Sequence, residues 1–355
     1  MNSAVQSVQR SGTGDDLPVI ESYTIENNRG TRLVVSNYGA AVVSLVVKNG
    51  LGSYVDVVLG YGDLREYLDD EYYLGTVVGR YANRIAGGRV FIDNEPFSLS
   101  VRSGGYHQHG GLIGFNKKFF TAFPFRSASG NGITFRYVSP DLEEGFPGEF
   151  SLDVTYILNE LDEWIVEYKG ISSKTTLVNL TQHVYFNLCG DPSRGLAGHE
   201  FRILSDQYLP VNQQQVPTGQ LAEVKNTPFD FTGFRSIDGS EPGDHEQLAL
   251  SNGYDHSFVL EAVHSAALKH AAVVREPACG IQLDVFTTEP SVHFYTGNFL
   301  DNVKGKNEVI YNKRAGFCLE TQHFPDSPNH PHFPSTVLEA GQEFYSKTVY
   351  RISVL

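Results

Sequence analysis

The residues best suited to proton chemistry are His183, in the stretch Thr176–Leu188, and Glu320, in the stretch Gly316–Pro325. Histidine and glutamate are side chains that enzymes commonly use to donate and accept protons. We hypothesise that the two face each other across a cleft as a general acid and a general base. Each also has an ordinary interpretation: a solvated histidine on a polar strand face, and a carboxylate at a strand edge or paired with an arginine.

Both stretches have the period of two that is typical of a β-strand. In Thr176–Leu188 the even positions are mostly apolar, whereas the odd ones mostly carry hydrogen-bonding groups: Asn179, Thr181, His183, Tyr185 and Asn187. One face should therefore enter a core, and the other should line a cleft suited to a sugar. In Gly316–Pro325 the glutamate shares a face with Cys318 and Gln322, which is unusual because strands deplete Glu and cores exclude unpaired charge.

Short segments rich in β-branched and aromatic residues recur along the chain, separated by turn residues. A hairpin is expected over Arg32–Val47 and a second one over Arg89–Leu99. Further strands are expected at Tyr54–Leu59, Thr121–Phe125, Ile133–Val138, Phe150–Leu158, Trp164–Ile171, Phe201–Leu204, His256–Glu261, Ala271–Arg275, Ile281–Thr288, Ser291–Tyr295, Gly316–His323 and Tyr345–Val354.

No amphipathic helix longer than about ten residues is predicted. Leu64–Tyr73 is expected to be a loop or a helical turn, and Tyr208–His245 to be loops with few strand pairings. Ala262–Ala272 is rich in alanine but lies among predicted strands, so its state is left open. Many short strands with few helices predict an all-β fold, a large antiparallel β-sandwich or a barrel.

The chain has 355 residues and a formal net charge of −14. Such an acidic chain argues against nucleic acid as a partner, because phosphates require a basic surface. No apolar run approaches the roughly 18 residues of a membrane span, so no membrane partner is expected. Three sparse cysteines do not form a disulfide framework, which fits a reducing compartment.

The N-terminal residues 1–17 are rich in Ser, Gly, Gln and Asp and lack the apolar core of a signal peptide. We interpret them as a flexible leader and expect a cytoplasmic protein. No Pro/Ser-rich linker or charge run divides the remainder, so residues 18–355 are expected to form a single domain. The sequence leaves the oligomeric state undetermined.

His107 and His109 could hold a metal together with Glu320 or His323, as in a cupin-like barrel. Glycines flank the two histidines, however, and no third ligand follows at a fixed spacing, so a metal-free site is favoured. Several other polar residues have ordinary interpretations as turn or solvated positions: Asn83, Arg84 and Asp255.

Six motifs, in order from about residue 20 to the C-terminus, resemble those of the aldose 1-epimerase family. They are Gly79-Arg-Tyr-Ala-Asn-Arg-Ile85, His109-Gly-Gly111 with Gly114-Phe-Asn-Lys117, Asn179-Leu-Thr-Gln-His-Val-Tyr-Phe-Asn-Leu188, Gly253-Tyr-Asp-His256, Phe294-Tyr-Thr-Gly-Asn-Phe299, and Leu319-Glu-Thr-Gln322 with Phe324-Pro-Asp-Ser-Pro-Asn-His330. The resemblance implies a large antiparallel β-sandwich with an open cleft. It also implies an enzyme without cofactor or metal that interconverts the α and β anomers of aldohexoses such as galactose and glucose.

By the same resemblance Glu320 would be the general base and His183 the general acid, with His109 assisting at the anomeric end. Sugar hydroxyls would be held by Asn83, Arg84 and Asp255, and Tyr185 is added because it lies on the polar face beside His183. Opening a cyclic hemiacetal requires one proton to be removed from the anomeric hydroxyl and another to be delivered to the ring oxygen. A carboxylate and an imidazolium can do both.

The sequence departs from the family pattern at two positions. His293 replaces the usual Gln before Phe-Tyr-Thr-Gly-Asn, and His107 is an extra histidine where the family usually has Asn-x-Leu-His-Gly-Gly. By alternation His293 shares a face with Tyr295 and could donate to a sugar hydroxyl. A different sugar or cyclic hemiacetal, and a sugar-binding protein without turnover, therefore stay as alternatives.

Overall fold

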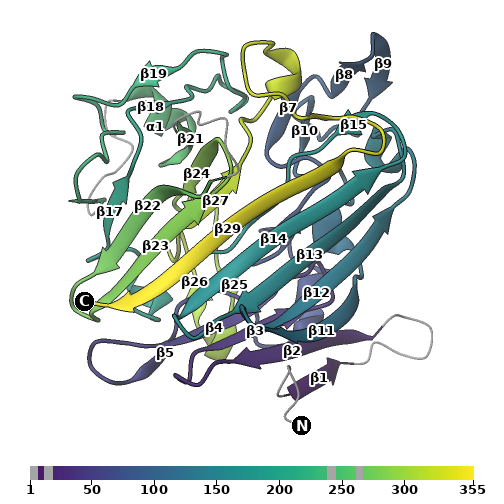
Figure 1. Cartoon of the computed structure of the whole chain (residues 1–355). Coiled ribbons are helices and arrows are strands. Elements are labelled where there is room, and N and C mark those ends of the chain that lie inside the picture. Colours follow the sequence, from purple (N-terminus) through teal and green to yellow (C-terminus); the bar gives the residue numbers. More distant parts are fainter. Residues whose placement is uncertain (1–6, 12–18, 238–244, 261–266) are drawn as a thin grey trace.

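The computed structural model describes residues 7–11, 19–237, 245–260 and 267–355. Most of its strands belong to three antiparallel sheets (Figure 1). The N-terminal sheet has the order β1 (Ser7–Ser11), β2 (Ile20–Glu26), β3 (Arg32–Ser36), β4 (Val42–Lys48) and β5 (Tyr54–Asp56). The largest sheet has the order β11 (Thr121–Ser127), β12 (Gly130–Ser139), β13 (Phe150–Leu158), β14 (Glu163–Ser172), β29 (Glu343–Val354), β23 (Ile281–Thr287), β22 (Lys269–Glu276), β17 (Glu200–Ile203) and β20 (Arg235–Ser236).

The third sheet, which we call the inner sheet, has the order β19 (Ala222–Glu223), β18 (Gln207–Tyr208), β21 (Asp255–Val259), β24 (Ser291–Tyr295) and β27 (Cys318–Gln322). Short strands pair two by two: β6 (Val77–Val78) with β16 (Thr181–Gln182), β7 (Arg84–Ala86) with β10 (Tyr106–Gln108), β8 (Arg89–Ile92) with β9 (Glu95–Ser98), β15 (Thr176–Leu177) with β28 (Val337–Leu338), and β25 (Val303–Lys304) with β26 (Ile310–Tyr311).

Helical structure is sparse throughout the described ranges. The single α-helix there is α1 (Glu246–Leu250), and the 3-10 turns are η1 (Leu64–Leu68), η2 (Phe115–Lys117), η3 (Glu143–Gly145), η4 (Pro192–Arg194), η5 (Lys306–Glu308) and η6 (Ser327–Asn329). The predicted all-β class is confirmed. None of these helices is long and apolar enough to cross a membrane, within the part of the chain that the structure describes.

The principal core lies between the sheets. It joins Leu33 of the N-terminal sheet, Trp164 and Tyr350 of the largest sheet, and Phe294 and Leu319 of the inner sheet in one buried cluster. The rings of Trp164 and Tyr350 stack with centroids 4.6 Å apart. Burial of this apolar surface is the main force that holds sheet against sheet. The predicted β-sandwich is therefore the observed architecture, with β22, β23 and β29 crossing in front of the inner sheet in Figure 1.

The inner sheet presents polar side chains on the face that points away from this core. In its register, His293 of β24 lies opposite both Ser257 of β21 and Glu320 of β27, and Tyr295 lies opposite Asp255. Residues paired across antiparallel strands project from the same face. The alternate residues Phe294 and Leu319 enter the core. The register therefore places ionisable residues from three strands side by side.

The prediction of one amphipathic strand over Thr176–Leu188 is wrong. The segment contains only the short β15 and β16 and isolated bridges, and every residue in it is buried. Because β27 and other segments cover both sides, most of the polar odd positions make structural hydrogen bonds. Thr181 Oγ1 donates to the Thr321 carbonyl at 3.0 Å, Asn187 Nδ2 donates to the Ala315 carbonyl at 2.9 Å, and Asn179 Oδ1 accepts from the His323 N–H at 2.9 Å.

Several segments left indistinct by the sequence now have structure. Within the predicted leader, Ser7–Ser11 forms β1 and pairs with β2, whereas residues 1–6 and 12–17 lie outside the described ranges. Described residues of the segment from Tyr208 to His245 form only the two-residue strands β18, β19 and β20, as expected. The last four residues of Ala262–Ala272 lie in β22, and residues 262–266 are outside the described part. The single domain over 18–355 stays a prediction.

Arg80 anchors the segment that leads into β7. Its buried guanidinium donates to the carbonyls of Pro147 and Gly148 at 3.0 and 2.9 Å, and to Ser139 Oγ at 2.6 Å. Burial lowers the pKa of Arg80 to about 10, so the group stays charged at neutral pH. These bonds fix the backbone just before Asn83.

Replacing Arg80 with Met should destabilise the fold, because the buried oxygens lose their donors at about 1–3 kcal/mol for each group left unpaired. We expect the free energy of unfolding, measured by urea denaturation, to fall by about 3 kcal/mol. The matched control is Arg32→Met on the exposed side of β3, which should change it by about 0.5 kcal/mol or less. Equal effects of the two variants would contradict the anchoring role of Arg80.

Candidate active site

All eight residues predicted to form a site line one pocket that opens to solvent: Asn83, Arg84, His109, His183, Tyr185, Asp255, His293 and Glu320. The space in the pocket and its open mouth together amounts to about 530 Å³. Six more residues complete its wall: Glu71, Tyr72, Tyr73, Gln108, Phe299 and Tyr295. The inner sheet, the β7–β10 pair with its flanking residues and the segment around His183 supply most of the lining. Glu71, Tyr72 and Tyr73 come from the loop after η1, and Phe299 comes from the loop after β24.

Glu320 and His183 meet in this pocket. The distance from His183 Nε2 to Glu320 Oε1 is 3.7 Å, and the two residues are 5% and 1% exposed. The other carboxyl oxygen, Oε2, has no hydrogen-bond partner among the described residues. An imidazole and a carboxyl group at this separation leave room for a reacting group to enter between them.

Burial opposes the charged form of each partner. It raises the pKa of Glu320 well above its usual value, and the negative charge of Asp255 adds to the effect. It also lowers the pKa of His183 to about 4. A neutral Glu320 with a neutral His183 and an ionised Glu320 with a protonated His183 hold the same number of protons. The two groups therefore share one exchangeable proton from the low pKa of His183 up to the raised pKa of Glu320. When ionised, Glu320 is a stronger base and His183 a stronger acid than either would be in water.

His109 is held beside the pair by the hairpin-like pairing of β7 and β10, in which Gln108 lies opposite Arg84. The Asn83 N–H donates to His109 Nδ1 at 3.2 Å, and the His109 N–H donates to the Asn83 carbonyl at 3.0 Å. Burial, followed by the charge of His183, holds the pKa of His109 well below its usual value. Since Nδ1 accepts, the neutral ring carries its proton on Nε2 and can donate a hydrogen bond.

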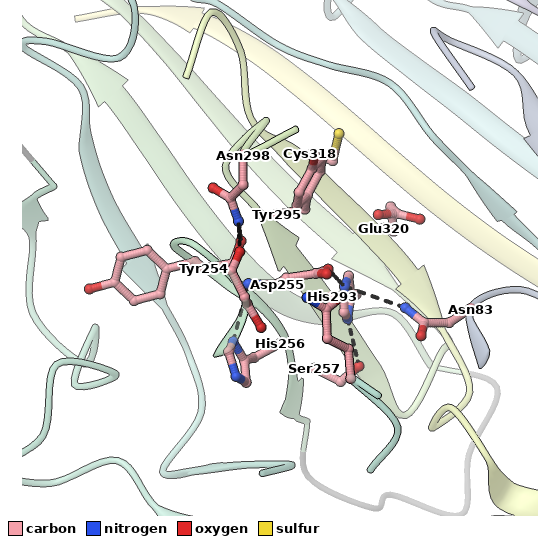
Figure 2. Close-up of polar contacts among 12 residues, drawn as sticks. Asn83, Tyr254, Asp255, His256, Ser257, His293, Tyr295, Asn298, Cys318 and Glu320 are labelled. Atoms are coloured by element: carbon pink, nitrogen blue, oxygen red, sulfur yellow. Dashed lines mark hydrogen bonds and ion pairs between the residues drawn. The ribbon is translucent and has the colours of Figure 1, made fainter. Parts of the chain in front are cut away.

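His293 links Asp255 with Ser257 and Asn83 in a polar network beside the inner sheet (Figure 2). Asp255 Oδ1 lies 2.7 Å from His293 Nε2, and Asp255 Oδ2 lies 3.5 Å from a guanidinium nitrogen of Arg84. His293 Nδ1 is 2.9 Å from Ser257 Oγ, and Asn83 Nδ2 is 3.4 Å from His293 Nε2. Burial alone raises the pKa of Asp255, but Arg84 and the His293 hydrogen bond outweigh it and hold the pKa below its usual value. Asp255 is thus a carboxylate at neutral pH.

Tyr185 lines the pocket with its ring rather than with a free hydroxyl. Its ring lies 5.0 Å from that of His183, and its hydroxyl donates to the Tyr72 carbonyl at 2.9 Å. Tyr73, which sequence reasoning missed, packs against both His109 and His183, with centroids 4.7 and 5.8 Å away. It comes from a loop without periodicity, so no pattern indicated it.

Tyr295 and Phe299 were likewise not assigned to the site. Alternation in β24 puts Tyr295 on the face of His293, which was a usable signal, and its ring stacks with that of Phe299 at 6.3 Å. Phe299 follows β24 in a loop and is half exposed at the pocket. Both aromatic rings line the pocket and give part of its wall an apolar surface.

The metal alternative built on His107 and His109 is wrong in its ligand set. His107 lies outside the pocket, with its Nδ1 2.8 Å from the Ser100 carbonyl and its ring against Phe146. His323 pairs with Glu289 at 2.6 Å instead of facing Glu320. Among the described residues, the grouping next to the pocket that could hold a metal is a different one, His183 and Glu320 with Cys318, which lies behind the pocket wall.

Comparison with known proteins agrees with this geometry. The family model for aldose 1-epimerase matches residues 21–351. Galactose mutarotase from Sus scrofa is 42% identical over 98% of this chain and 99% of its own length, and the Homo sapiens protein of the same name is 41% identical over 94% of each. Aldose 1-epimerase from Escherichia coli is 36% identical over 92% of this chain and 94% of its own.

Solved structures agree as well. An aldose epimerase homologue from C. elegans superimposes with a TM-score of 0.85 and 27% identity, covering 94% of this chain and 99% of its own. Galactose 1-epimerase from Lactobacillus acidophilus gives a TM-score of 0.85 and 26% identity over 98% of each chain. The sequence matches and the shared fold lead to one conclusion: this chain belongs to the aldose 1-epimerase family and is an isomerase that interconverts anomers.

Proposed function

We propose that this chain acts on free galactose and glucose, and that it opens and recloses their rings by acid–base catalysis between Glu320 and His183. The observation that carries the proposal is the 3.7 Å approach of these two buried groups in a pocket that Asp255 also lines. The names of the mammalian relatives, galactose mutarotase, support galactose as a substrate. The cytoplasmic location expected from the sequence stays a prediction.

In the proposed reaction, the Glu320 carboxylate takes the proton of the anomeric hydroxyl while the His183 imidazolium gives a proton to the ring oxygen. The bond between C1 and the ring oxygen breaks, and the anomeric oxygen becomes the carbonyl of the free aldehyde. Rotation about C1–C2 presents the other face of the carbonyl. The two proton transfers then run in reverse and restore both side chains, so no proton is gained or lost.

The other polar residues are proposed to position the sugar. His109 would donate from Nε2 to an oxygen at the anomeric end, because its Nδ1 is already occupied by the Asn83 N–H. Asp255 would accept from one sugar hydroxyl, while Arg84 and Asn83 would donate to others. A carboxylate next to a guanidinium offers both an acceptor and fixed donors to neighbouring hydroxyls. Orientation of this kind adds to the acid–base contribution.

The first test is polarimetry of freshly dissolved α-galactose and α-glucose. Wild-type protein should accelerate equilibration of both, and Glu320→Gln should lower kcat by about 100- to 10,000-fold with little change in KM, because a general base contributes about that much. Glu95→Gln, at an exposed position of β9, serves as the control and should leave kcat unchanged. Near-normal turnover of Glu320→Gln would remove Glu320 from catalysis, and no acceleration by folded wild type would refute the proposed substrates.

The pH profile of kcat/KM tests whether Glu320 and His183 share one proton during catalysis. Below the His183 pKa of about 4 both groups are protonated and the base is lost. Above the raised pKa of Glu320 both groups have lost their protons and the acid is lost. We therefore expect activity to rise with pH through about 4, to level off, and to fall at a pH well above an ordinary carboxyl pKa. After subtraction of the spontaneous reaction, a profile flat across this range would count against the pair.

The variant His293→Gln tests whether His293 helps to set the preference between galactose and glucose. His293 contacts the Asp255 carboxylate directly. An amide in place of the imidazole would contact Asp255 differently, which should change how the carboxylate binds a sugar hydroxyl. We expect the ratio of kcat/KM for galactose to that for glucose to change about twofold to tenfold, because one hydrogen bond of the Asp255 carboxylate is altered rather than removed. An unchanged ratio, with both rates measurable, would show that His293 does not select between these sugars.

A further inference from the structure

Two thiols and a carboxylate gather outside the pocket, at Cys189, Glu276 and Cys279. One ligand atom of each residue lies within 4.8 Å of those of the other two. Cys189 directly follows the segment that carries His183, whereas Glu276 ends β22 and Cys279 lies in the turn between β22 and β23. That turn lies beside the C-terminus in Figure 1, where the Leu355 N–H donates to the Gly280 carbonyl at 3.0 Å. None of the three residues lines the sugar pocket.

Glu276 is the unusual member of this group because it is only 1% exposed. Its Oε2 accepts the N–H of Cys279, which fixes the direction of the carboxyl group. Among the described residues, no lysine, arginine or histidine forms an ion pair with it. A buried carboxylate without a cation is costly. What Glu276 lacks among the described residues is therefore a cation in direct contact with its carboxyl group.

We propose that Cys189, Glu276 and Cys279 bind one thiophilic divalent cation of the Zn²⁺ class, with water as the fourth ligand. Two thiolates and one carboxylate suit such ions, which bind sulfur at about 2.3 Å and oxygen at about 2.0–2.2 Å in tetrahedral sites. Those lengths correspond to ligand atoms roughly 3.5–3.8 Å apart, so the observed cluster needs only a small contraction. Cys279 is partly exposed, which gives the ion a path from solvent.

Charge and proton balance are consistent with this site. Binding of M²⁺ converts both thiols to thiolates, releases two protons to solvent, and leaves a complex of three anionic ligands with a net charge of about −1. Arg194 lies close enough for its positive charge to act on both sulfur atoms, and it would offset that charge. The ion would tie the end of the His183 segment to the β22–β23 turn. Its effect is thus on stability rather than on the proton transfers.

The test is a titration of metal-free protein with Cd²⁺, under a phosphine reductant that keeps the thiols reduced. We expect an ultraviolet thiolate-to-cadmium charge-transfer band that saturates at one ion for this site, and a rise in Tm with added Cd²⁺ or Zn²⁺. Cys279→Ser and Cys189→Ser should each abolish saturation at this site. Glu276→Gln should weaken binding about tenfold or more while the band remains.

Cys318→Ser is the matched control, because Cys318 belongs to the competing group with His183 and Glu320. Retention of the band and of the Tm shift in Cys318→Ser, together with their loss in Cys279→Ser, supports the proposal. The reverse result places the ion in the sugar pocket and overturns it. A reduced wild-type protein that binds no Cd²⁺ also overturns it, as would a native disulfide between Cys189 and Cys279 that gives no band after reduction. If Cys189→Ser fails to fold, Cys279→Ser decides, since its side chain lies in a partly exposed turn.

Discussion

The rest of the site depends on one electrostatic contrast between two buried carboxyl groups. Asp255 is paired with Arg84 and His293, so it is ionised in spite of its burial. Glu320 lies 3.7 Å from His183 but has no arginine or lysine ion-pair partner among the described residues, and one of its oxygens has no hydrogen-bond partner there. Different surroundings thus push the pKa values of two neighbouring carboxyl groups apart, which is how one site can contain both a fixed acceptor and a group that exchanges protons. The charge of Asp255 itself contributes to the raised pKa of Glu320.

This contrast requires the inner sheet to be covered on both faces. Its core face packs against the largest sheet through residues such as Phe294 and Leu319. Its other face is covered by the β7–β10 pair and by the segment that carries His183. Burial of this strand face desolvates Glu320 and makes its carboxylate a stronger base. The register places His293 beside Glu320 in one row of the sheet, and Asp255 beside Tyr295 in the next row on the same face.

The covering segments are held in place by side-chain hydrogen bonds rather than by long strands. Asn179, Thr181 and Asn187 connect the His183 segment to the backbone around β27, and Arg80 bonds the segment before β7 to the carbonyls of a distant loop. Polar side chains inside the fold therefore do what ladder hydrogen bonds do in a regular sheet. In our proposal a bound cation at Cys189 would add one more link at the end of the same segment.

Much of this protein was determined by local sequence. Alternation and turn residues predicted most strands of the sheets, and the face shared by Cys318 and Glu320 followed from the period of two. The resemblance of six ordered motifs indicated the family and six of the residues that line the pocket, and alternation along the strands added Tyr185 and His293. The period of two could not predict the surroundings of Thr176–Leu188. Its apolar and polar residues do alternate, but segments distant in sequence cover both of its faces. Most of its polar groups therefore make hydrogen bonds that hold the fold together. Tyr73 joined the pocket from a loop without any pattern.

The pairing of Asp255, the isolation of Glu320 and the pKa shifts of both were decided only by the tertiary structure, because desolvation and charge depend on atoms that strand register and sheet packing bring together from opposite ends of the chain.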